Sequence, residues 1–364
     1  MNIAECNSAA PVKAFAEENE GIRMNTLSTA VIGLGRVGWQ FHIPHILAHD
    51  GFQLTAVVDP LDERRAEARQ TFGVQGYADY AELLERETPD LIVLASPTHL
   101  HAEQAIQAMA RGIDVFCDKP MARSLAEVDA MIAAMRAHGR KLMVFQPHRV
   151  TNEAAAIRHI LARDWLGEIF MVRRTLCSYT RRNDWQAFTE YGGGMLNNFG
   201  AHCLDQVLHL FGFGVRRCDC HLRKIASLGD ADDVVKALVE LENGAIVDIE
   251  INMACGVSIP NWTICGRRGT AIHQGDRFIV RYYRDDELAH LGLQDGLAAA
   301  NRKYGNEDVI PWRTEELPLA DYPGADFYDH CYAYYAEDKP PFVPVEETRE
   351  VMRLLGAFRA CAGW

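Results

Sequence analysis

The sequence predicts an α/β protein in which a doubly wound parallel sheet is followed by a second α/β domain with an open, mostly antiparallel sheet. Two observations support this prediction. Between residues 28 and 145, short apolar runs alternate with helical patterns, as in parallel sheets whose strands are joined by helices. After about residue 150, strand-like runs follow one another across short turns such as Asn243-Gly244, a pair that favours a hairpin.

The N-terminal region contains five apolar runs that are short enough to be buried strands. These strands are expected at residues 29–32, 54–58, 91–95, 114–117 and 141–145. The helices between them are expected at residues 62–72, 80–87, 101–111 and 125–137. Because neighbouring parallel strands need a crossover connection, this order predicts a sheet with helices on both faces.

The second region is expected to begin with a helix at 151–161, a long strand at 168–179 and a helix at 197–211. Six more strands are expected at 216–226, 234–241, 245–253, 261–265, 270–274 and 278–283. Residues 285–322 are polar and irregular, and we expect a surface excursion there, with a cover over the active site or an oligomer contact as alternatives. Two helices, at 326–337 and 345–362, are expected to end the chain. The predicted division is a tail at 1–24, domains at 25–148 and 149–338, and a terminal helical segment at 339–364.

The composition is that of an ordinary globular protein, with 364 residues, 48% of them hydrophobic and 24% charged. The net charge of -13 argues against nucleic acid as the main partner, because phosphate binding needs a basic patch. No apolar run is long enough to cross a membrane, and residues 1–24 do not read as a secretory signal, so a cytoplasmic location is expected. The ten cysteines form no Cys-x-x-Cys pair and are expected to be reduced and mostly buried.

A glycine-rich motif directly follows the first predicted strand and opens a helix. The motif is Gly33-Leu34-Gly35-Arg36-Val37-Gly38. Gly33 permits a tight turn, Gly35 lets the backbone approach a pyrophosphate, and Gly38 allows close packing of helix on strand. With Asp59 at the end of the second strand, this motif predicts a Rossmann domain that binds a dinucleotide.

Asp59 also bears on the choice of cofactor. A carboxylate at this position accepts hydrogen bonds from a ribose 2′-hydroxyl and repels a 2′-phosphate. Arg64 and Arg65 lie a helical turn further along the chain and are expected to be solvated. The sequence therefore predicts NAD, with NADP less favoured.

Two further segments contain polar residues in unusual settings. Lys119 follows a buried strand, although lysine is rarely buried without a partner. Further on, four polar residues with i, i+4, i+7, i+11 spacing would share one face of an otherwise apolar helix; they are Asn198, His202, Asp205 and His209. Such a stripe is expected to face a cavity or a partner. A structural His–Asp pair is the alternative, and no metal site is expected because helical spacing alone does not make ligands converge.

In this order, the glycine motif, Asp118-Lys119-Pro120 and the segment from Gly192 to Asp205 resemble the Gfo/Idh/MocA family of NAD(P)-dependent oxidoreductases, which act on sugars, cyclitols and related polyols. The resemblance implies that Asp118 and Lys119 lie beside the nicotinamide and that His202 is the catalytic base opposite it. Many dehydrogenases of the family have an aspartate four residues before this histidine, where the present chain has Asn198. Residues 285–322 match the family poorly.

The resemblance also assigns residues around the cofactor and the substrate. In the family, the segment that follows the third strand lies along the nicotinamide ribose. This implies cofactor contacts for Ser96, Pro97 and His101, with a structural hydrogen bond as the alternative for His101. Apart from the resemblance, arginine and tryptophan suit a polyol, which makes Arg149, Arg182 and Trp185 candidate substrate contacts, with a packed Trp185 and solvated arginines as the alternative. Asp205, on the same side of the helix as His202, is a further candidate. A homo-oligomer, a dimer or a tetramer through the C-terminal sheet, is expected.

The expected reaction is oxidation of a secondary hydroxyl group, with His202 as base, Lys119 stabilising the oxygen and hydride passing to nicotinamide C4. Two alternatives stay open. One is NAD-dependent glycoside cleavage without net redox change, and the other is a sensor that binds dinucleotide and sugar without catalysis.

Overall fold

The computed structural model describes residues 25–293 and 308–364, which form two compact units. The first unit consists of Met1–Asp118, Ala130–Met143 and Tyr328–Phe342, described from residue 25 onward. The second consists of Lys119–Asp129, Val144–Phe327 and Val343–Trp364. The predicted tail at 1–24 lies outside the described residues.

A six-stranded sheet with the order β3-β2-β1-β4-β5-β6 forms the centre of the first unit. The strands are β1 (Leu27–Ile32), β2 (Phe52–Val58), β3 (Gln75–Tyr77), β4 (Leu91–Leu94), β5 (Asp114–Cys117) and β6 (Leu142–Val144). β1 pairs in parallel with both β2 and β4, so the strand order reverses there, as in doubly wound sheets. The predicted parallel sheet is confirmed, and only the short edge strand β3 was not predicted.

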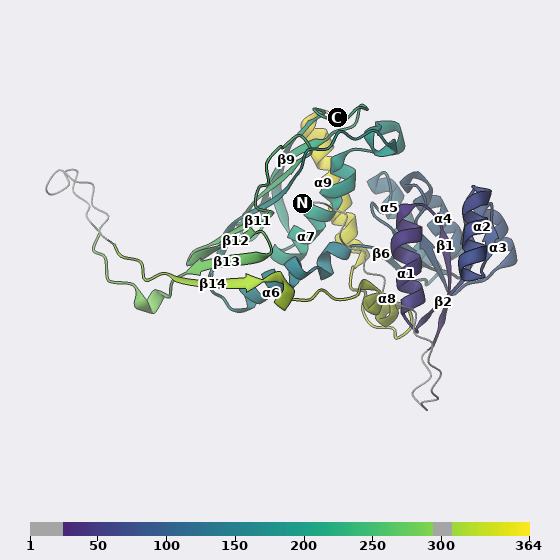
Figure 1. Cartoon of the computed structure of the whole chain (residues 1–364), viewed down its shortest axis with the longest axis horizontal. Coiled ribbons are helices and arrows are strands. Elements are labelled where there is room, and N and C mark those ends of the chain that lie inside the picture. The colour runs from purple at the N-terminus through teal and green to yellow at the C-terminus, as the bar shows by residue number, and fades with distance from the viewer. Residues whose placement is uncertain (1–24, 294–307) are drawn as a thin grey trace. The chain divides into compact units, whose positions relative to one another are not determined.

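Helices of the first region pack against this sheet, with α1 and α2 beside β2 and α4 beside β4 and β5 (Figure 1). The helices are α1 (Ile43–Ala48), α2 (Asp62–Phe72), α3 (Tyr80–Arg86), α4 (Thr98–Ala110) and α5 (Leu125–Ala137). Every residue of β4 is buried, which explains why its sequence is a continuous apolar run and does not alternate.

The helix α8 (Phe327–Tyr335) completes the core of the first unit from far along the chain. The buried ring of Tyr328 meets Phe52 and Phe116 edge-on, at centroid distances of 5.4 and 5.8 Å. The Tyr335 hydroxyl donates a hydrogen bond to the Val115 carbonyl. This grouping differs from the linear division into 25–148 and 149–338 that the sequence suggests, because a segment around residues 328–342 packs with the N-terminal sheet.

An eight-stranded sheet with the order β14-β13-β12-β11-β7-β10-β9-β8 forms the second unit. The strands are β7 (Ile169–Cys177), β8 (Val215–Arg223), β9 (Val234–Leu241), β10 (Ile246–Asn252), β11 (Trp262–Gly266), β12 (Gly269–Gln274), β13 (Arg277–Tyr282) and β14 (Arg313–Pro318). β7 and β10 are parallel, and the other pairs are antiparallel. The predicted open, mostly antiparallel sheet is confirmed.

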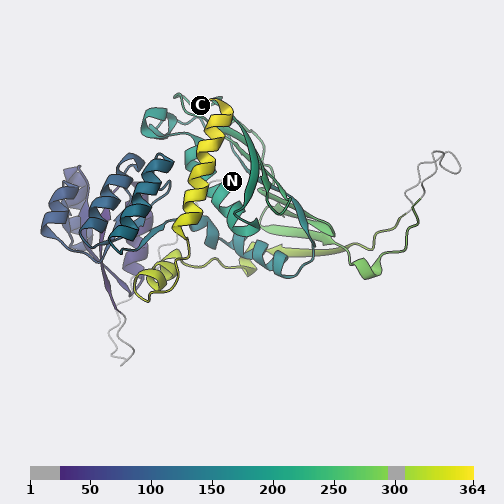
Figure 2. The ribbon, with the colours of Figure 1, turned by 180° about the vertical axis from the view of Figure 1, so that it is seen from behind.

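Three longer helices belong to the second unit: α6 (Asn152–Ala162), α7 (Ala201–Phe211) and α9 (Val345–Ala362). α9 packs against both β8 and α7, and Figure 2 shows it running along this unit. The alternating burial of β9 shows that one face of the sheet is covered and the other is open. None of the helices in the described residues is long and apolar enough to span a membrane.

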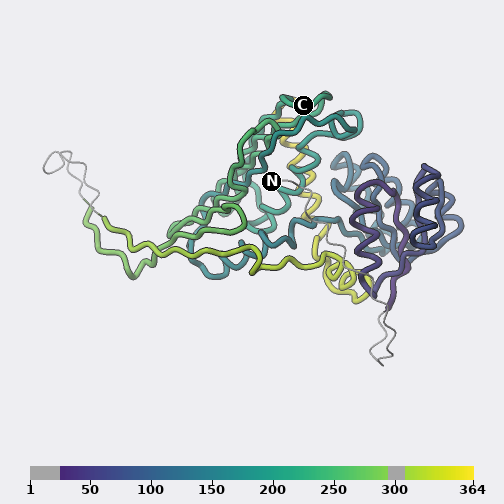
Figure 3. Tube along the Cα trace, in the orientation of Figure 1, coloured from purple at the N-terminus to yellow at the C-terminus, as the bar shows by residue number. Residues whose placement is uncertain are grey.

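The expectation of an irregular segment at 285–322 is wrong for its C-terminal part. β14 pairs with β13 in an antiparallel register that places Arg313 opposite Tyr282, and Figure 3 shows the two segments running side by side. β14 was missed because four of its six residues are exposed, so its sequence lacks an apolar repeat. Residues 294–307 of this segment lie outside the described residues.

Candidate active site

The glycine motif forms a tight turn at the end of β1. Gly33 has φ +96°, and a Cβ there would lie 2.6 Å from the Ala95 carbonyl oxygen. A Cβ on Gly38 would lie 2.0 Å from the Gly33 carbonyl oxygen. At Gly35 a Cβ would meet no atom within 4 Å. Gly33 and Gly38 are therefore required by packing, whereas Gly35 borders open space, where the backbone can approach a phosphate.

The helix that follows begins at Arg36 and Val37 and includes a π-helical turn, Gly38–His42, before α1. Its first turn lies at the carboxyl end of β1, where backbone N–H groups and the helix dipole favour an anion. The Arg36 side chain is exposed, and its guanidinium carbon lies 5.9 Å from the centroid of the Phe41 ring. The cofactor contacts predicted for Arg36 and Val37 stay predictions.

Asp59 is buried at the end of β2, and its carboxylate accepts hydrogen bonds from the Leu34 N–H at 2.8 Å and the Leu61 N–H at 3.0 Å. Arg64 lies 3.2 Å from the same carboxylate. Arg65 donates to the Asp59 carbonyl at 2.7 Å and is only 15% exposed. The expectation that both arginines are solvated is therefore wrong for Arg65, whereas the Arg64 side chain is 43% exposed and also pairs with Asp59.

The segment after β4 is held by its own hydrogen bonds. The Ser96 hydroxyl lies 2.6 Å from the Gln104 side-chain oxygen, and the buried His101 ring lies 2.9 Å from the Ser96 carbonyl oxygen. Pro97 precedes the first residue of α4. The structural hydrogen bond considered for His101 is thus present. A cofactor contact by Ser96, Pro97 or His101 stays a prediction.

Lys119 and Asn198 are joined by two hydrogen bonds within the second unit. The Lys119 ammonium donates to the Asn198 carbonyl oxygen at 2.6 Å and to its side-chain oxygen at 3.1 Å. Asn198 lies in a π-helical turn, Leu196–Gly200, that leads into α7. Such π-helical turns, which interrupt the regular hydrogen bonding of an α-helix, are frequently found at functional sites. Asp118, the preceding residue, closes β5 with a hydrogen bond to the Leu94 carbonyl.

Gln186 is a site residue that the sequence does not reveal. Its side-chain oxygen accepts a hydrogen bond from the Asn198 amide at 3.1 Å, and its carbonyl accepts one from the Gly194 N–H at 2.9 Å. The neighbouring residues Arg182 and Trp185 were predicted as substrate contacts. Arg182 is 24% exposed, and Trp185 is 52% exposed. Both are accessible to a ligand, and their contact with substrate stays a prediction.

Asp232 anchors the glycine-rich segment before α7. Its carbonyl accepts from the Met195 N–H and its carboxylate from the Leu196 N–H, at 2.9 and 2.8 Å. Burial raises the pKa of Asp232 to about 6. Gly194 has φ +99°, and a Cβ there would lie 2.2 Å from the Asp232 carboxylate. The anchor therefore requires glycine at this position.

His202 is buried in the first turn of α7, and its ring stacks on that of His148 with a centroid distance of 4.2 Å and an interplanar angle of 16°. Burial holds the pKa of His202 well below its ordinary value of 6.5, and the charges of Lys119, His148 and Arg174 lower it further. The pKa of His148 is lowered to about 4 by burial and then by Arg174 and Lys119. His202 is consequently neutral near pH 7 and able to accept a proton.

Arg149 and Asp205 form a salt bridge in which neither side chain is exposed. The guanidinium donates to both carboxylate oxygens, at 2.8 and 2.6 Å, and to Glu347 of α9 at 2.6 Å. Direct contact of either residue with substrate, as predicted from the sequence, would require this bridge to open. The residues of the predicted polar helix face therefore have different partners. The charge of Lys119 acts on His202, whereas Asp205 is bound to Arg149.

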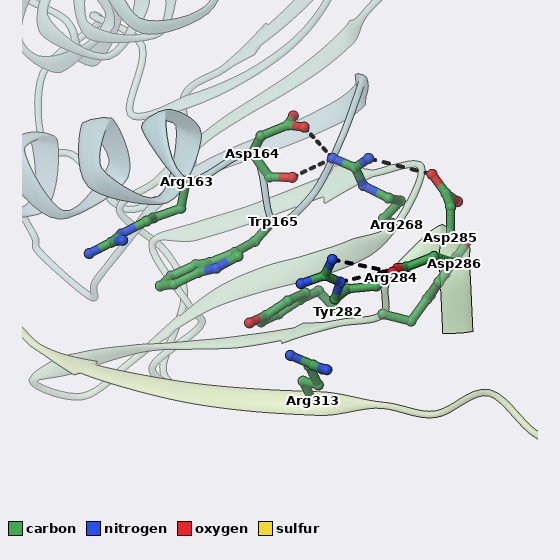
Figure 4. Close-up of a pocket in the computed structure, with 10 residues that line it drawn as sticks. Arg163, Asp164, Trp165, Arg268, Tyr282, Arg284, Asp285, Asp286 and Arg313 are labelled. Atoms are coloured by element: carbon green, nitrogen blue, oxygen red, sulfur yellow. Dashed lines mark hydrogen bonds and ion pairs between the residues drawn. The ribbon is translucent and has the colours of Figure 1, made fainter. Parts of the chain in front are cut away.

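An open pocket of about 450 Å³ lies elsewhere in the second unit and contains none of the predicted site residues (Figure 4). Trp165 and Tyr282 stack there at a centroid distance of 5.4 Å. The surrounding arginines are largely engaged by carboxylates, as Arg268 is by Asp164 and Asp285. Among the described residues, no group of three or more His, Cys, Asp or Glu side chains could hold a metal ion.

Two family models match the chain. The model of the oxidoreductase family GFO_IDH_MocA, described as an NAD-binding Rossmann fold, matches residues 27–146. The model of the GFO/IDH/MocA C-terminal domain matches residues 154–272. The two matches fall on the glycine motif and Lys119 in the first case and on His202 in the second.

Individual proteins are similar over most of their length. D-glucoside 3-dehydrogenase from Escherichia coli is 27% identical over 300 residues, which cover 76% of this chain and 84% of that protein. Inositol 2-dehydrogenase from Pseudarthrobacter chlorophenolicus is 30% identical over 62% of this chain and 67% of that protein. Among solved structures, an NAD-binding protein from Listeria innocua has a TM-score of 0.77 and 24% identity, and covers 93% of this chain and 95% of its own. That last likeness concerns the fold alone.

Proposed function

Because the chain belongs to the Gfo/Idh/MocA family of oxidoreductases, we propose that it is an NAD-dependent dehydrogenase that oxidises a secondary hydroxyl group of a sugar, cyclitol or related polyol. One observation supports this most directly. The second unit holds a fixed ammonium group, that of Lys119, within electrostatic reach of the neutral imidazole of His202. A hydrogen-bond donor and a proton acceptor are what the oxidation of an alcohol requires.

In the proposed reaction, the substrate hydroxyl lies against Lys119 and His202. His202 takes the hydroxyl proton, which a neutral ring can do. Lys119 donates a hydrogen bond to the same oxygen and stabilises the negative charge that develops on it. When bound, NAD supplies the acceptor for the hydride that leaves the carbon.

Asn198 and Gln186 are positioning residues in this proposal. The Asn198 side-chain oxygen accepts from Lys119, and its amide donates to Gln186, so both ends of the amide are engaged. This arrangement fixes the direction in which the Lys119 side chain extends. An amide does not ionise near neutral pH, so Asn198 orients the lysine and takes no part in proton transfer.

The residues of the first unit fit the phosphates and ribose of a dinucleotide. Gly35 leaves room for a pyrophosphate beside the backbone, and Asp59 offers a carboxylate to a ribose 2′-hydroxyl. We propose NAD over NADP on this basis. Arg64, which lies 3.2 Å from that carboxylate, is the residue that could weaken the preference by approaching a 2′-phosphate.

The test is a screen of sugars, glycosides and inositols with NAD, in which reduction of the cofactor is followed by absorbance. We expect NADH to accumulate with at least one polyol and not with the Lys119→Met or His202→Ala variants. The similarity to D-glucoside 3-dehydrogenase and inositol 2-dehydrogenase guides the choice of compounds. Cleavage of an aryl glycoside without NADH accumulation would replace the proposal with a redox-neutral hydrolase. NADH binding with no turnover of any compound would replace it with a sensor.

A further inference from the structure

In the part of the chain that the structure describes, Nδ1 of His202 lacks the hydrogen bond that usually orients a catalytic histidine. In most such sites, one ring nitrogen faces the substrate while the other is bonded to a carboxylate or carbonyl oxygen. Within the described residues, Nδ1 of His202 is enclosed and has no hydrogen-bond partner. Some other contact must therefore fix the plane of the ring.

That contact is the ring of His148. The two imidazoles lie nearly parallel, at a centroid distance of 4.2 Å. His148 belongs to a short 3-10 helix, Pro147–Val150, that is bound to α7 at two points. Gln206 donates to the His148 carbonyl at 2.8 Å, and Arg149 is paired with Asp205. The helix that carries His202 thus also holds the backbone that carries the stacking ring.

We propose that His148 is the positioning residue of His202, and that its stacked ring takes the place of the absent hydrogen bond. The stack fixes the plane of the His202 ring and leaves Nε2, the nitrogen other than the enclosed Nδ1, to take the substrate proton. The inference rests on the proposed function, because it assigns His148 a part in the same reaction.

The charges around the two rings give the stack a second effect. The charges of Lys119 and Arg174 lower the pKa of both rings, whereas the carboxylate of Glu153 raises the pKa of His148. Two protonated imidazoles at this separation repel each other, so the pair holds one proton at a time. His148 therefore stays neutral while His202 takes the substrate proton.

Two substitutions separate the ring from its charge. His148→Phe keeps a flat ring against His202 and removes the titrating group. His148→Ala removes both. We expect His148→Ala to lower kcat on the order of 10²-fold, the scale of a misplaced catalytic group, with NADH binding unchanged. We expect His148→Phe to keep kcat within about threefold of wild type, because a flat ring still lies against His202.

His159→Ala is the matched control, because His159 also contacts aromatic rings in the second unit, those of Trp165 and Tyr322. We expect it to leave kcat and the pH profile unchanged. A reading that does not depend on turnover comes from the NMR signals of the His202 ring carbons and their protons. Stacking displaces these proton signals upfield, and the displacement should persist in His148→Phe and disappear in His148→Ala.

A wild-type kcat in His148→Ala, or His202 ring signals that are the same in all three proteins, would overturn the inference. Far-ultraviolet circular dichroism and thermal unfolding establish that each variant is folded, and His148→Phe provides the test if His148→Ala is not. If the wild type oxidises none of the polyols, the proposed function fails by itself. The NMR comparison still decides whether His148 fixes the His202 ring.

Discussion

The ammonium nitrogen of Lys119 lies 2.6 Å from the carbonyl oxygen of Asn198 and 3.1 Å from its side-chain oxygen. Both acceptors are neutral, so these two bonds fix the direction of the side chain without cancelling its charge. A positioned cation of this kind is suited to a substrate oxygen that becomes negative during the reaction.

Replacement of Lys119 by methionine should therefore lower turnover by about 10²-fold or more while the fold and NAD binding persist, because an electrostatic or acid–base group is lost. Single-turnover and steady-state rates of NADH formation measure the effect. Lys141→Met is a suitable control, because Lys141 also donates to two main-chain carbonyls, those of Tyr334 and Tyr335, but within the first unit. Near-normal turnover in Lys119→Met would remove Lys119 from the mechanism.

Substitution of Asn198 by aspartate should move the rising limb of the pH–rate profile to higher pH. The new carboxylate favours the protonated form of His202, so the pKa of that ring rises from its depressed value towards 6.5. A base acts only when it is deprotonated, and the variant therefore needs a higher pH to become active. Gln186 can turn its amide to donate to the new oxygen, which preserves the local structure. An active variant with an unshifted profile would show that His202 is not the titrating base.

Loss of the Gln186 side-chain contact should weaken catalysis to a smaller degree. Gln186→Leu removes the acceptor for the Asn198 amide, and a net loss of about 1 kcal/mol, the usual contribution of one hydrogen bond, corresponds to roughly fivefold in kcat/KM. Gln186→Glu keeps an acceptor at the same place and should stay near wild type. Equal losses in the two variants would mean that Gln186 acts through the shape of its segment and not through this hydrogen bond.

The cofactor preference should depend on Asp59 and Arg64 together. Asp59→Ser removes the charge that repels a 2′-phosphate, so the difference in affinity between NADH and NADPH should narrow. Adding Arg64→Ala to Asp59→Ser should widen the difference in affinity again, because Arg64 is the cation that lies beside residue 59 in the wild type. Fluorescence titration of both cofactors measures the two effects. Tighter binding of NADPH by the wild type would contradict the preference assigned to Asp59.

The Arg149–Asp205 pair should contribute strongly to stability. Arg149→Met leaves the carboxylate of Asp205 buried without its cation, and a change of this kind costs about 3–5 kcal/mol of unfolding free energy. The double variant Arg149→Met with Asp205→Leu removes both charges and should recover much of that loss. Urea unfolding of the three proteins measures the difference. An additive loss in the double variant would contradict a coupled pair.

Periodicity and the glycine motif predicted most of the fold, because buried strands and helices leave apolar patterns in the sequence. The bounds of α2, α5 and α9 were predicted to the residue. β3 and β14 were not predicted, because a three-residue edge strand and an exposed edge strand bury too few side chains to leave such a pattern.

Sequence reasoning reached the site only in part. Lys119, Asn198 and His202 were identified through motifs; in the structure Lys119 binds Asn198, and the charge of Lys119 lowers the pKa of His202. The contributions of Gln186 and His148 could not be predicted, because each depends on a side-chain contact between separate elements, which the periodicity of the sequence does not show. Arg65 was misjudged because helical spacing does not show that its side chain folds back onto the Asp59 carbonyl.

α8 is synthesised late but packs into the core of the unit that is synthesised first. A ribosome produces all six strands of the parallel sheet, and then the whole of the other sheet, before it reaches Tyr328. Until then the rings of Phe52 and Phe116 lack the partner that meets them edge-on. Domains often mature from the N-terminus as the chain emerges, but this dinucleotide-binding unit cannot complete its core until α8 has been translated.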